Sequence, residues 1–415
     1  MPETLIDGLQ PLTAAALEAS PRVITARFEM LAAEAHEEEL RSLTRPRADF
    51  YLDGAYRENN ATRMGSFETY YSLVAEQPLW HWNSLDNQKK IAKIQRQLAE
   101  KDYDEARRSL VLDIRQRYVD LVLKKRELAE TEAAYNRQSR HLAVSREQAG
   151  RGELPADLLA GERLDLRTTE VARDRKRADF QRSLREFALM NGLSSFTGDT
   201  LPAKIPGVPV EALSLFRSLE PVSPVSNRVP VALAKDDGLL AQARLNEQVI
   251  RVRDLPMFNL AAGADQDQTS GADQTAVISY FAGVRVRWNI FDGFATRAAT
   301  REARAQVRGK EKALELARTG MFQQLADAAT DIELASKGLQ IAEERFDLTQ
   351  AHQRVDRDLW QSGRLSETEW QLVQSTAEGE DTALMQLRGQ LILQLAEYEL
   401  MRQRATKSSQ EISFP

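Results

Sequence analysis

The sequence predicts a mostly α-helical fold with a β-barrel contribution, built from two tandem copies of one module. Three observations predict it: an internal repeat with an offset of 211 residues, two proline-free helical stretches of sixty-odd residues, and two hairpins whose strands alternate apolar and polar residues. Such a long repeat indicates an architecture of stacked modules rather than one globular core. Each copy has the order helix, β-hairpin, very long helix, turn and returning helix.

An ungapped alignment of the chain with itself reveals the repeat. Placing Pro78–Trp82 over Asn289–Gly293 brings Gly152–Leu154 onto Gly363–Leu365. Apolar residues then coincide at steps of three and four, the spacing of one helix face. The coinciding pairs are Tyr103 and Leu314, Ala106 and Ala317, Leu110 and Met321, Ile114 and Leu325, Tyr118 and Ala329, Leu121 and Ile332, and Leu128 and Leu339.

The boundaries of the two copies follow from this register. The first copy covers residues 1–191 with a hairpin at about 47–82, and the second covers 228–405 with a hairpin at about 256–293. A Pro-rich connector, residues 192–227, joins them, and a polar tail, 406–415, follows. The expected helices are Leu12–Leu43, Ser84–Ala149, Pro155–Met190, Pro230–Arg253, Thr296–Gln361 and Ser366–Arg404, and the expected strands are Asp49–Arg57, Glu68–Gln77, Phe258–Asp265 and Ala276–Asn289.

The two long helices set the scale of the molecule. At 1.5 Å per residue, sixty-odd residues form a rod on the order of 100 Å, far longer than a helix of a globular domain. Charged residues make up 28% of the chain and aromatic residues 7%, which is typical of solvated helices rather than of a thick core.

Composition also excludes several classes of function. No concentrated basic block exists, so no nucleic-acid partner is expected. With four His and no Cys, thiolate zinc sites, disulfides and a cysteine nucleophile are excluded, and neither a cofactor nor catalysis is expected. No apolar stretch reaches 18 residues, so no membrane-spanning helix is predicted, and no export signal is visible at the N-terminus.

The strand-like run of residues 277–289 alternates apolar and polar residues with a period of two. One apolar face and one partly charged face are typical of a transmembrane barrel strand, in which aromatic residues lie near the membrane surfaces. Four strands cannot close a barrel, so several chains must contribute. Two ordinary hairpins capping a helical bundle are the alternative. The candidate interface aromatics are Tyr70, Tyr71, Trp80, Trp82, Tyr280 and Trp288.

Two motifs flank the long helix of the second copy: Trp288-Asn-Ile-Phe-Asp-Gly-Phe294 precedes it and Trp360-Gln-Ser-Gly-Arg-Leu-Ser366 follows it. They resemble the strand-to-helix junction and the periplasmic turn of the TolC family of outer-membrane efflux and secretion channels. The first copy has Glu76-Gln-Pro-Leu-Trp80 and Ala149-Gly-Arg-Gly-Glu-Leu-Pro155 at the corresponding places, but His81-Trp82 replaces the Asp-Gly of the second copy. The order of elements and the duplication match over nearly the whole chain.

The resemblance implies a homotrimer in the outer membrane. Each protomer would give four strands to a twelve-stranded barrel in the lipid bilayer, and the helices would form a tube that extends into the periplasm, with the connector near its equator. The turn ends would meet a periplasmic adaptor (membrane fusion protein) and, through it, an inner-membrane transporter.

The resemblance also implies a gate of acidic residues just after each turn. The candidates are Glu367 and Glu369 in the second copy and Asp157 in the first. A structural role competes with this one, because Ser366 and Glu369 have the spacing of a capping box, and Pro155 with Asp157 suits the first turn of a helix. The residues expected to face the adaptor at the turns are Gly152, Leu154, Pro155, Gly363, Arg364, Leu365 and Ser366.

Two further expectations concern single residue types. Gly152 and Gly363 are expected to adopt positive φ, which a tight reversal requires. Arg285 and Arg287 lie on the partly charged strand face and would make the barrel lumen locally basic; a salt bridge to an acid such as Asp265 is the alternative.

Two functions remain from the sequence. The first is a passive exit duct of a tripartite efflux pump or type I secretion system, gated at the periplasmic helical end. The second is a soluble coiled-coil scaffold with β-hairpin caps, which explains the solvated composition but not the apolar strand face.

Overall fold

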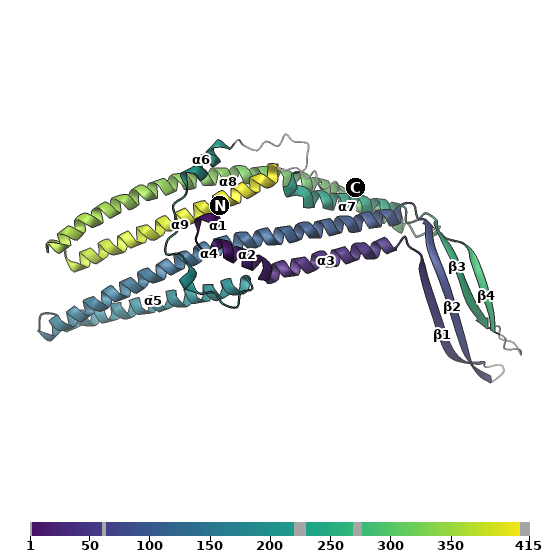
Figure 1. The fold of residues 1–415 in the computed structure, drawn as a ribbon, viewed down its shortest axis with the longest axis horizontal. Helices are drawn as coiled ribbons and strands as arrows, with labels where there is room; N and C mark the ends of the chain where they lie inside the picture. Colours follow the sequence, from purple (N-terminus) through teal and green to yellow (C-terminus); the bar gives the residue numbers. More distant parts are fainter. Residues whose placement is uncertain (1, 60–63, 220–229, 269–275, 407–415) are drawn as a thin grey trace. The chain divides into compact units, whose positions relative to one another are not determined.

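The computed structural model describes residues 2–59, 64–219, 230–268 and 276–406 (Figure 1). The predicted fold class is confirmed, since each copy contains a β-hairpin, a very long helix and a returning helix. The chain forms two compact units: unit 1 comprises Met1–Arg27, Asp102–Ala232 and Thr319–Ser408, and unit 2 comprises Phe28–Lys101, Leu233–Arg318 and Ser409–Pro415. Parts of both hairpin loops, the end of the connector and nearly all of the polar tail lie outside the described residues.

The sequence repeat is also a structural repeat. Helices α4 (Ser84–Gly150) and α8 (Ala295–Gln361) each span 67 residues, and their first and last residues are 211 positions apart. The returning helices α5 (Ala156–Met190) and α9 (Glu367–Thr406) begin at the same offset. At 1.5 Å per residue each long helix measures about 100 Å.

The N-terminal segment departs from the prediction. One helix over Leu12–Leu43 is wrong, because the structure has α1 (Pro2–Leu5), α2 (Leu9–Ala19) and α3 (Pro21–Ser42). Gly8, which lies between α1 and α2, has a φ of 81° and so separates the two helices. Ser20 is extended, with a ψ of 128°, because the proline that follows it disfavours helical geometry at the preceding residue.

The connector contains elements that the sequence analysis did not assign. They are a short 3₁₀ turn (Gly198–Thr200) and helix α6 (Val210–Ser218), which begins after Pro209. Phe216 of α6 packs edge-to-face on Tyr398 of α9, with ring centroids 5.2 Å apart. The second copy opens with a 3₁₀ turn (Val231–Leu233) and helix α7 (Ala234–Arg251).

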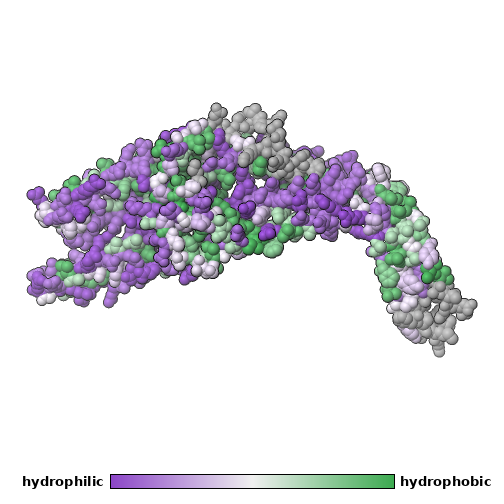
Figure 2. Space-filling view, viewed as in Figure 1, coloured by the Kyte–Doolittle hydropathy of each residue, from purple (hydrophilic) through white to green (hydrophobic). Residues whose placement is uncertain are grey.

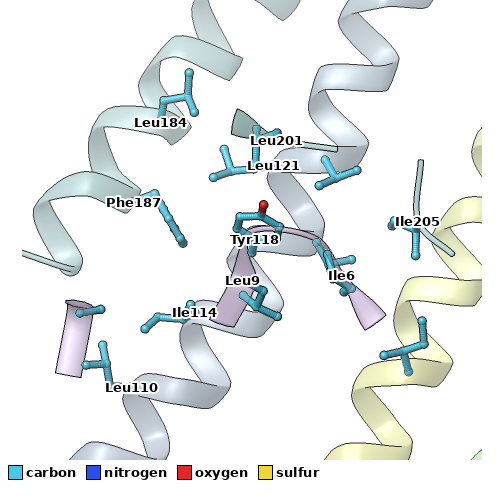
Figure 3. Packing of buried hydrophobic residues seen from close by; sticks show 14 of the residues in the cluster. Ile6, Leu9, Leu110, Ile114, Tyr118, Leu121, Leu184, Phe187, Leu201 and Ile205 are labelled. Atoms are coloured by element: carbon cyan, nitrogen blue, oxygen red, sulfur yellow. The ribbon is translucent and has the colours of Figure 1, made fainter. Parts of the chain in front are cut away.

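Unit 1 holds two hydrophobic clusters, one for each helical pair. The first joins α4 and α5 to the N-terminal helices; Tyr118 is buried at its centre, near Phe187, and its hydroxyl donates to the carbonyl of Asp7 at 2.7 Å (Figure 3). The second joins α8 and α9 through Leu325, Ile332, Leu339, Leu384 and Leu391. Most of the predicted apolar pairs therefore lie on core faces, as their spacing indicated.

Polar contacts fix the directions of the helices in unit 1. Arg177 of α5 pairs with Glu132 of α4 at 2.7 Å, and Arg388 of α9 pairs with Glu343 of α8 at 2.8 Å. The Arg137 guanidinium of α4 binds both carboxylate oxygens of Glu378 in α9, each at 2.9 Å. These pairs join helices of opposite direction, so the α4–α5 turn and the α8–α9 turn lie at the same end of unit 1 (Figure 1).

Unit 2 contains one antiparallel sheet. Strands β1 (Arg47–Asn59), β2 (Met64–Trp80), β3 (Met257–Gln268) and β4 (Ala276–Arg287) pair in the order β1-β2-β3-β4, so the two hairpins meet along β2 and β3. Most of these strands are longer than predicted. Ser72 faces Asp265 at this junction, and the Ser72 hydroxyl donates to the Asp265 carboxylate.

The helical part of unit 2 packs through a small apolar cluster and a buried ion pair. Ile94 and Leu98 of α4 contact Leu245 of α7. Glu37 of α3 is buried and accepts from Arg96 of α4 at 2.7 Å, which ties these two helices together. In the part of the chain that the structure describes, no helix is both long enough and apolar enough to cross a membrane.

Candidate functional site

The pairing register sorts the residues of the sheet onto two faces, because residues opposite each other on paired strands share a face. Arg285 faces Asn259, and Asp265 faces Ser72, which in turn faces Tyr51. Among residues 47–56, 70–80, 257–266 and 277–287, every charged residue lies on this face. They are Arg47, Asp49, Asp53, Glu76, Asp265, Arg285 and Arg287.

The opposite face is mostly apolar on all four strands, and Gln77 and Gln266 are its polar residues within these ranges. A bulge between Pro78 and Trp80 shifts the register, so Trp80 faces Phe258 and also lies on this side. Tyr280 is 79% exposed and Phe50 is 66% exposed, although such side chains are normally buried. The other exposed apolar residues of this face are Leu52, Tyr56, Tyr71, Leu73, Leu260, Ile278, Val284 and Val286.

Two expectations about the sheet are corrected. Tyr70 does not lie with the other aromatic residues of the apolar face; it lies on the charged face, where its ring centroid is 6.0 Å from that of Tyr51. The acid that pairs with Arg285 is Glu76 rather than Asp265, because Asp265 accepts from Ser72. The sequence could not distinguish these acids, since the pairing of β2 with β3 sets which residues meet.

The two strand-to-helix junctions share a backbone conformation despite their different sequences. Gly293 and Phe294 have φ of 66° and 69°, and the equivalent Trp82 and Asn83 have φ of 54° and 60°. Left-handed conformations are unfavourable for side chains larger than glycine. The replacement of Asp-Gly by His-Trp therefore leaves the junction geometry unchanged.

Side chains around the junctions hold this geometry in different ways. The Asp292 carboxylate accepts from the Thr296 hydroxyl at 2.5 Å and from its amide at 2.7 Å, and these bonds keep the pKa of Asp292 below its ordinary value. The indole of Trp82 donates to the Pro256 carbonyl at 2.8 Å. The indole of Trp288 donates to the Asp254 carbonyl at 3.0 Å, so both junctions are tied to the segment that enters β3.

The two turns of unit 1 have the same backbone pattern. Gly152 and Gly363 have φ of 79° and 73°, as the tight reversal requires. In the first turn the amide of Glu153 donates to the Gln148 carbonyl at 3.0 Å, and in the second the amide of Arg364 donates to the Leu359 carbonyl at 2.9 Å. This is the Schellman arrangement, in which a glycine just after the helix allows the last carbonyls to be satisfied.

The second turn carries a complete capping box. The Ser366 amide and hydroxyl donate to one Glu369 carboxylate oxygen at 2.9 and 2.7 Å, and the Glu369 amide donates back to the Ser366 hydroxyl at 3.2 Å. These bonds lower the pKa of Glu369. The capping role predicted for this pair is therefore confirmed.

A tryptophan pair that was not predicted from the sequence adds to the second turn. Trp360 stacks on Trp370 with centroids 5.6 Å apart and planes 16° apart, and its indole donates to Glu367 at 2.9 Å. The two tryptophans are ten residues apart and lie on either side of the turn glycine, and this spacing could have predicted their contact. Glu367 and Glu369 are thus held by separate hydrogen bonds at this turn, Glu367 to Trp360 and Glu369 to Ser366.

The first turn has no such network in the described residues. Pro155 was expected as the first helical residue, but it is extended, with a ψ of 145°, and α5 begins at Ala156. Its side chain makes no cap hydrogen bond, because proline has no acceptor there. Asp157 and Arg364 are exposed, whereas Leu154 and Leu365 are half-buried at their turns.

No cluster in the described residues suits a metal ion, since no three His, Cys, Asp or Glu side chains lie together. The chain's distinctive surfaces are therefore the apolar sheet face, the charged sheet face and the two turns.

Comparisons with known proteins agree with this geometry. Residues 233–401, most of the second copy, match the family model described as outer membrane efflux protein. A search of curated proteins gave no match. Solved structures match over nearly the whole chain.

Three solved structures illustrate the shared fold. The CmeC outer membrane channel of Campylobacter jejuni has a TM-score of 0.73 at 15% identity, covering 97% of this chain and 88% of that one. The outer membrane protein VceC of Vibrio cholerae has 0.69 at 13%, covering 94% and 95%. The MtrE outer membrane channel of Neisseria gonorrhoeae, in its open state, has 0.65 at 15%, covering 96% and 91%.

Residues 233–401 therefore match the outer membrane efflux protein family model, and the whole chain shares the fold of the TolC-like outer-membrane channels that it resembles in sequence.

Proposed function

We propose that the protein is an outer-membrane exit duct of an efflux pump or secretion system, active as a homotrimer. Three copies of the four-stranded sheet would close a twelve-stranded barrel, and the helices would form a tube that extends into the periplasm. The chain itself would provide a passive path. A periplasmic adaptor would connect it to an inner-membrane transporter, which would supply the energy for export.

The observation that carries this proposal is the two-faced sheet. Its apolar face is exposed on all four strands, and all charged residues among 47–56, 70–80, 257–266 and 277–287 lie on the other face. A barrel in a lipid bilayer needs this division, with apolar side chains toward lipid and polar ones toward the lumen. A soluble scaffold has no use for an uncovered apolar face of this extent.

Neighbouring residues of β4 allow a matched test. Ile278 lies on the apolar face and Ser279 on the charged face, and both are exposed. The purified full-length protein, Ile278→Lys and Ser279→Lys are added to planar lipid bilayers, and channel insertion and conductance are recorded. We expect Ile278→Lys to insert less often, since a lysine facing lipid costs up to about 1 kcal/mol near the membrane surface and about 2–4 kcal/mol at the midplane. Ser279→Lys should insert normally.

Two results would contradict the proposal. One is equal insertion by both variants, which would mean that the apolar face does not meet lipid. The other is a wild-type chain that stays soluble without detergent and forms no channels, which would favour the coiled-coil scaffold.

The finer part of the proposal concerns the turns. Glu367 and Glu369 would form an acidic ring that narrows the periplasmic end, with Asp157 of the first copy as a weaker contributor. Rings of acidic side chains bind or select cations in pores. The turn residues Gly152, Leu154, Pro155, Gly363, Arg364, Leu365 and Ser366 would face the adaptor. Arg285 and Arg287 would line the lumen, where Glu76 partly offsets their charge.

A further inference from the structure

Arginines gather where the sheet of unit 2 continues into α8. Arg251, Arg297, Arg301 and Arg304 line one open cleft of about 680 Å³. The other residues that line the cleft are Asp254, Phe294, Thr296 and Thr300, so Asp254 contributes its one carboxylate. The cleft therefore has an excess of positive charge.

Most of this charge is unpaired within the described part of the chain. Arg304 pairs with Glu247 at 3.1 Å. Arg251, Arg297 and Arg301 are exposed, and no described carboxylate lies within 4.0 Å of their guanidinium groups. The Arg297 guanidinium instead lies over the ring of Phe294, 5.2 Å from its centroid. Such a group keeps its donors free for an external acceptor.

Aromatic side chains connect this cleft to the apolar face of the sheet. Trp288, which follows β4, is 57% exposed and donates to the carbonyl of Asp254, a residue of the cleft. Phe291 and Phe294 are 71% and 58% exposed and contact each other edge-to-face at 5.5 Å. Apolar side chains, aromatic rings and arginines thus follow one another in space. Membrane proteins place these side chains in the same order from the lipid core, through the interface, to the head groups.

The first copy repeats the basic composition of the helix start, although Lys89 pairs there with Asp86 at 2.6 Å and Arg96 with Glu37 at 2.7 Å. The first fourteen residues of α4 and of α8 each contain four basic residues and one acid. Figure 2 shows hydrophobic residues gathered over the strands and hydrophilic residues over the helices that adjoin them. In α4 the basic residues are Lys89, Lys90, Lys93 and Arg96, and in α8 they are Arg297, Arg301, Arg304 and Arg308.

We propose that the cleft of Arg251, Arg297 and Arg301 binds the phosphate group of an anionic phospholipid at the membrane surface beside the strand-to-helix junction. The proposal rests on the proposed function, because it needs the apolar face to be in lipid. Guanidinium groups suit this ligand, since their planar donors bind two phosphate oxygens at once. The exposed aromatic rings would contact the glycerol and upper acyl region.

The test measures lipid binding by the purified full-length protein. Native mass spectrometry in neutral detergent counts phosphatidylglycerol and phosphatidylcholine of identical acyl chains bound to each protomer. The triple variant Arg251→Gln/Arg297→Gln/Arg301→Gln is compared with Arg163→Gln/Arg167→Gln/Arg175→Gln. The control removes the same charge from three exposed arginines of α5.

We expect wild type to prefer phosphatidylglycerol, and the triple variant to bind it at least about tenfold more weakly, since each basic side chain at an anionic surface contributes about a fivefold factor. Phosphatidylcholine binding and the control variant should match wild type. The three single variants are measured in the same way, so that the result does not depend on the folding of the triple variant.

Two results would overturn this inference alone. One is a wild-type protein that conducts in phosphatidylcholine bilayers but binds both lipids equally. The other is a triple variant that keeps its phosphatidylglycerol affinity while the trimer becomes less stable, which would assign the arginines to a neighbouring protomer. A wild-type protein that forms no channels in either lipid would instead overturn the proposed function, and the lipid site with it.

Discussion

The two turns of unit 1 share a backbone but differ in their side chains. Both end a 67-residue helix with a glycine at positive φ and the same carbonyl-satisfying bonds. Around this backbone the second turn builds a capping box and a tryptophan pair, whereas the first turn has a proline without a cap bond. The two copies thus share the glycine and the backbone hydrogen bonds that reverse the chain, whereas the exposed side chains around them differ.

The largest expected effect concerns the shared glycine conformation. Gly192, at the end of α5, has a φ of 69°, and an added Cβ would lie 2.1 Å from the Ala19 carbonyl oxygen, whereas a Cβ at Gly152 or Gly363 meets nothing within 4 Å. Gly192→Ala should lower the free energy of unfolding by about 3 kcal/mol or more, through both strain and overpacking. Gly152→Ala and Gly363→Ala should each cost about 1–2 kcal/mol.

Thermal and denaturant unfolding followed by circular dichroism measures these costs. Equal losses at all three positions would show that the clash with Ala19 relaxes without cost. Unequal losses at Gly152 and Gly363 would show that the two turns do not share their backbone energetics.

The next effect compares how much the acidic residues of each turn contribute to closing the channel. Glu367→Gln/Glu369→Gln should raise the leak conductance of the closed channel several-fold, because it weakens the charge-assisted hydrogen bonds from Trp360 and Ser366 that hold the proposed ring in place. Glutamine at position 369 can still serve in the capping box, so the turn should stay folded. Asp157→Asn is the matched change in the first copy and should have less effect. Unchanged single-channel leak in the double variant would remove these residues from the gate.

A smaller effect tests the cap itself. Ser366→Ala should destabilise the protein by about 1 kcal/mol, because it removes both hydroxyl bonds of the capping box. The equivalent change in the first copy, Pro155→Ala, should be close to neutral, since that position has no cap bond to lose. The difference in unfolding midpoint between the two variants checks this prediction, and a larger loss for Pro155→Ala would refute it.

The smallest effect is a pH dependence of the second turn. The Ser366 bonds lower the pKa of Glu369 from its ordinary value of 4.5, so the folded state holds this carboxylate ionised more strongly than the unfolded state does. Its contribution is therefore fully present above about pH 4.5 and is lost as the pH falls through the lowered pKa. The stability difference between wild type and Glu369→Gln should narrow only in that acidic range. A difference that is constant from pH 3 to 7 would contradict the assignment.

The two strand-to-helix junctions, like the two turns, share a backbone conformation and differ in their side chains. Trp82 and Asn83 adopt the left-handed conformations that Gly293 and Phe294 adopt in the second copy. His81-Trp82 thus departs from the motif in sequence but not in backbone conformation. The hydrogen bond from the Trp82 indole to the Pro256 carbonyl supports this conformation. It could not be predicted from local sequence, because its partners are 174 residues apart.

The sequence by itself determined the elements of this protein that depend on local periodicity. The offset of 211 residues, the long helices, the strand alternation and the turn glycines could all be read from the residues, because helix faces, strand faces and positive φ are set by neighbours along the chain. The capping box of Ser366 and Glu369 was predicted for the same reason, since its partners are three residues apart.

The tertiary structure decided what depends on partners distant in sequence. The pairing of β2 with β3 decided that Glu76 meets Arg285. Packing against the cores of unit 1 decided the helix in the connector, where Phe216 meets Tyr398. The arginine cleft of unit 2 likewise joins the end of α7 to the start of α8. Such contacts cannot be read from the chain, because the free energy that selects them comes from burial and pairing rather than from local preference.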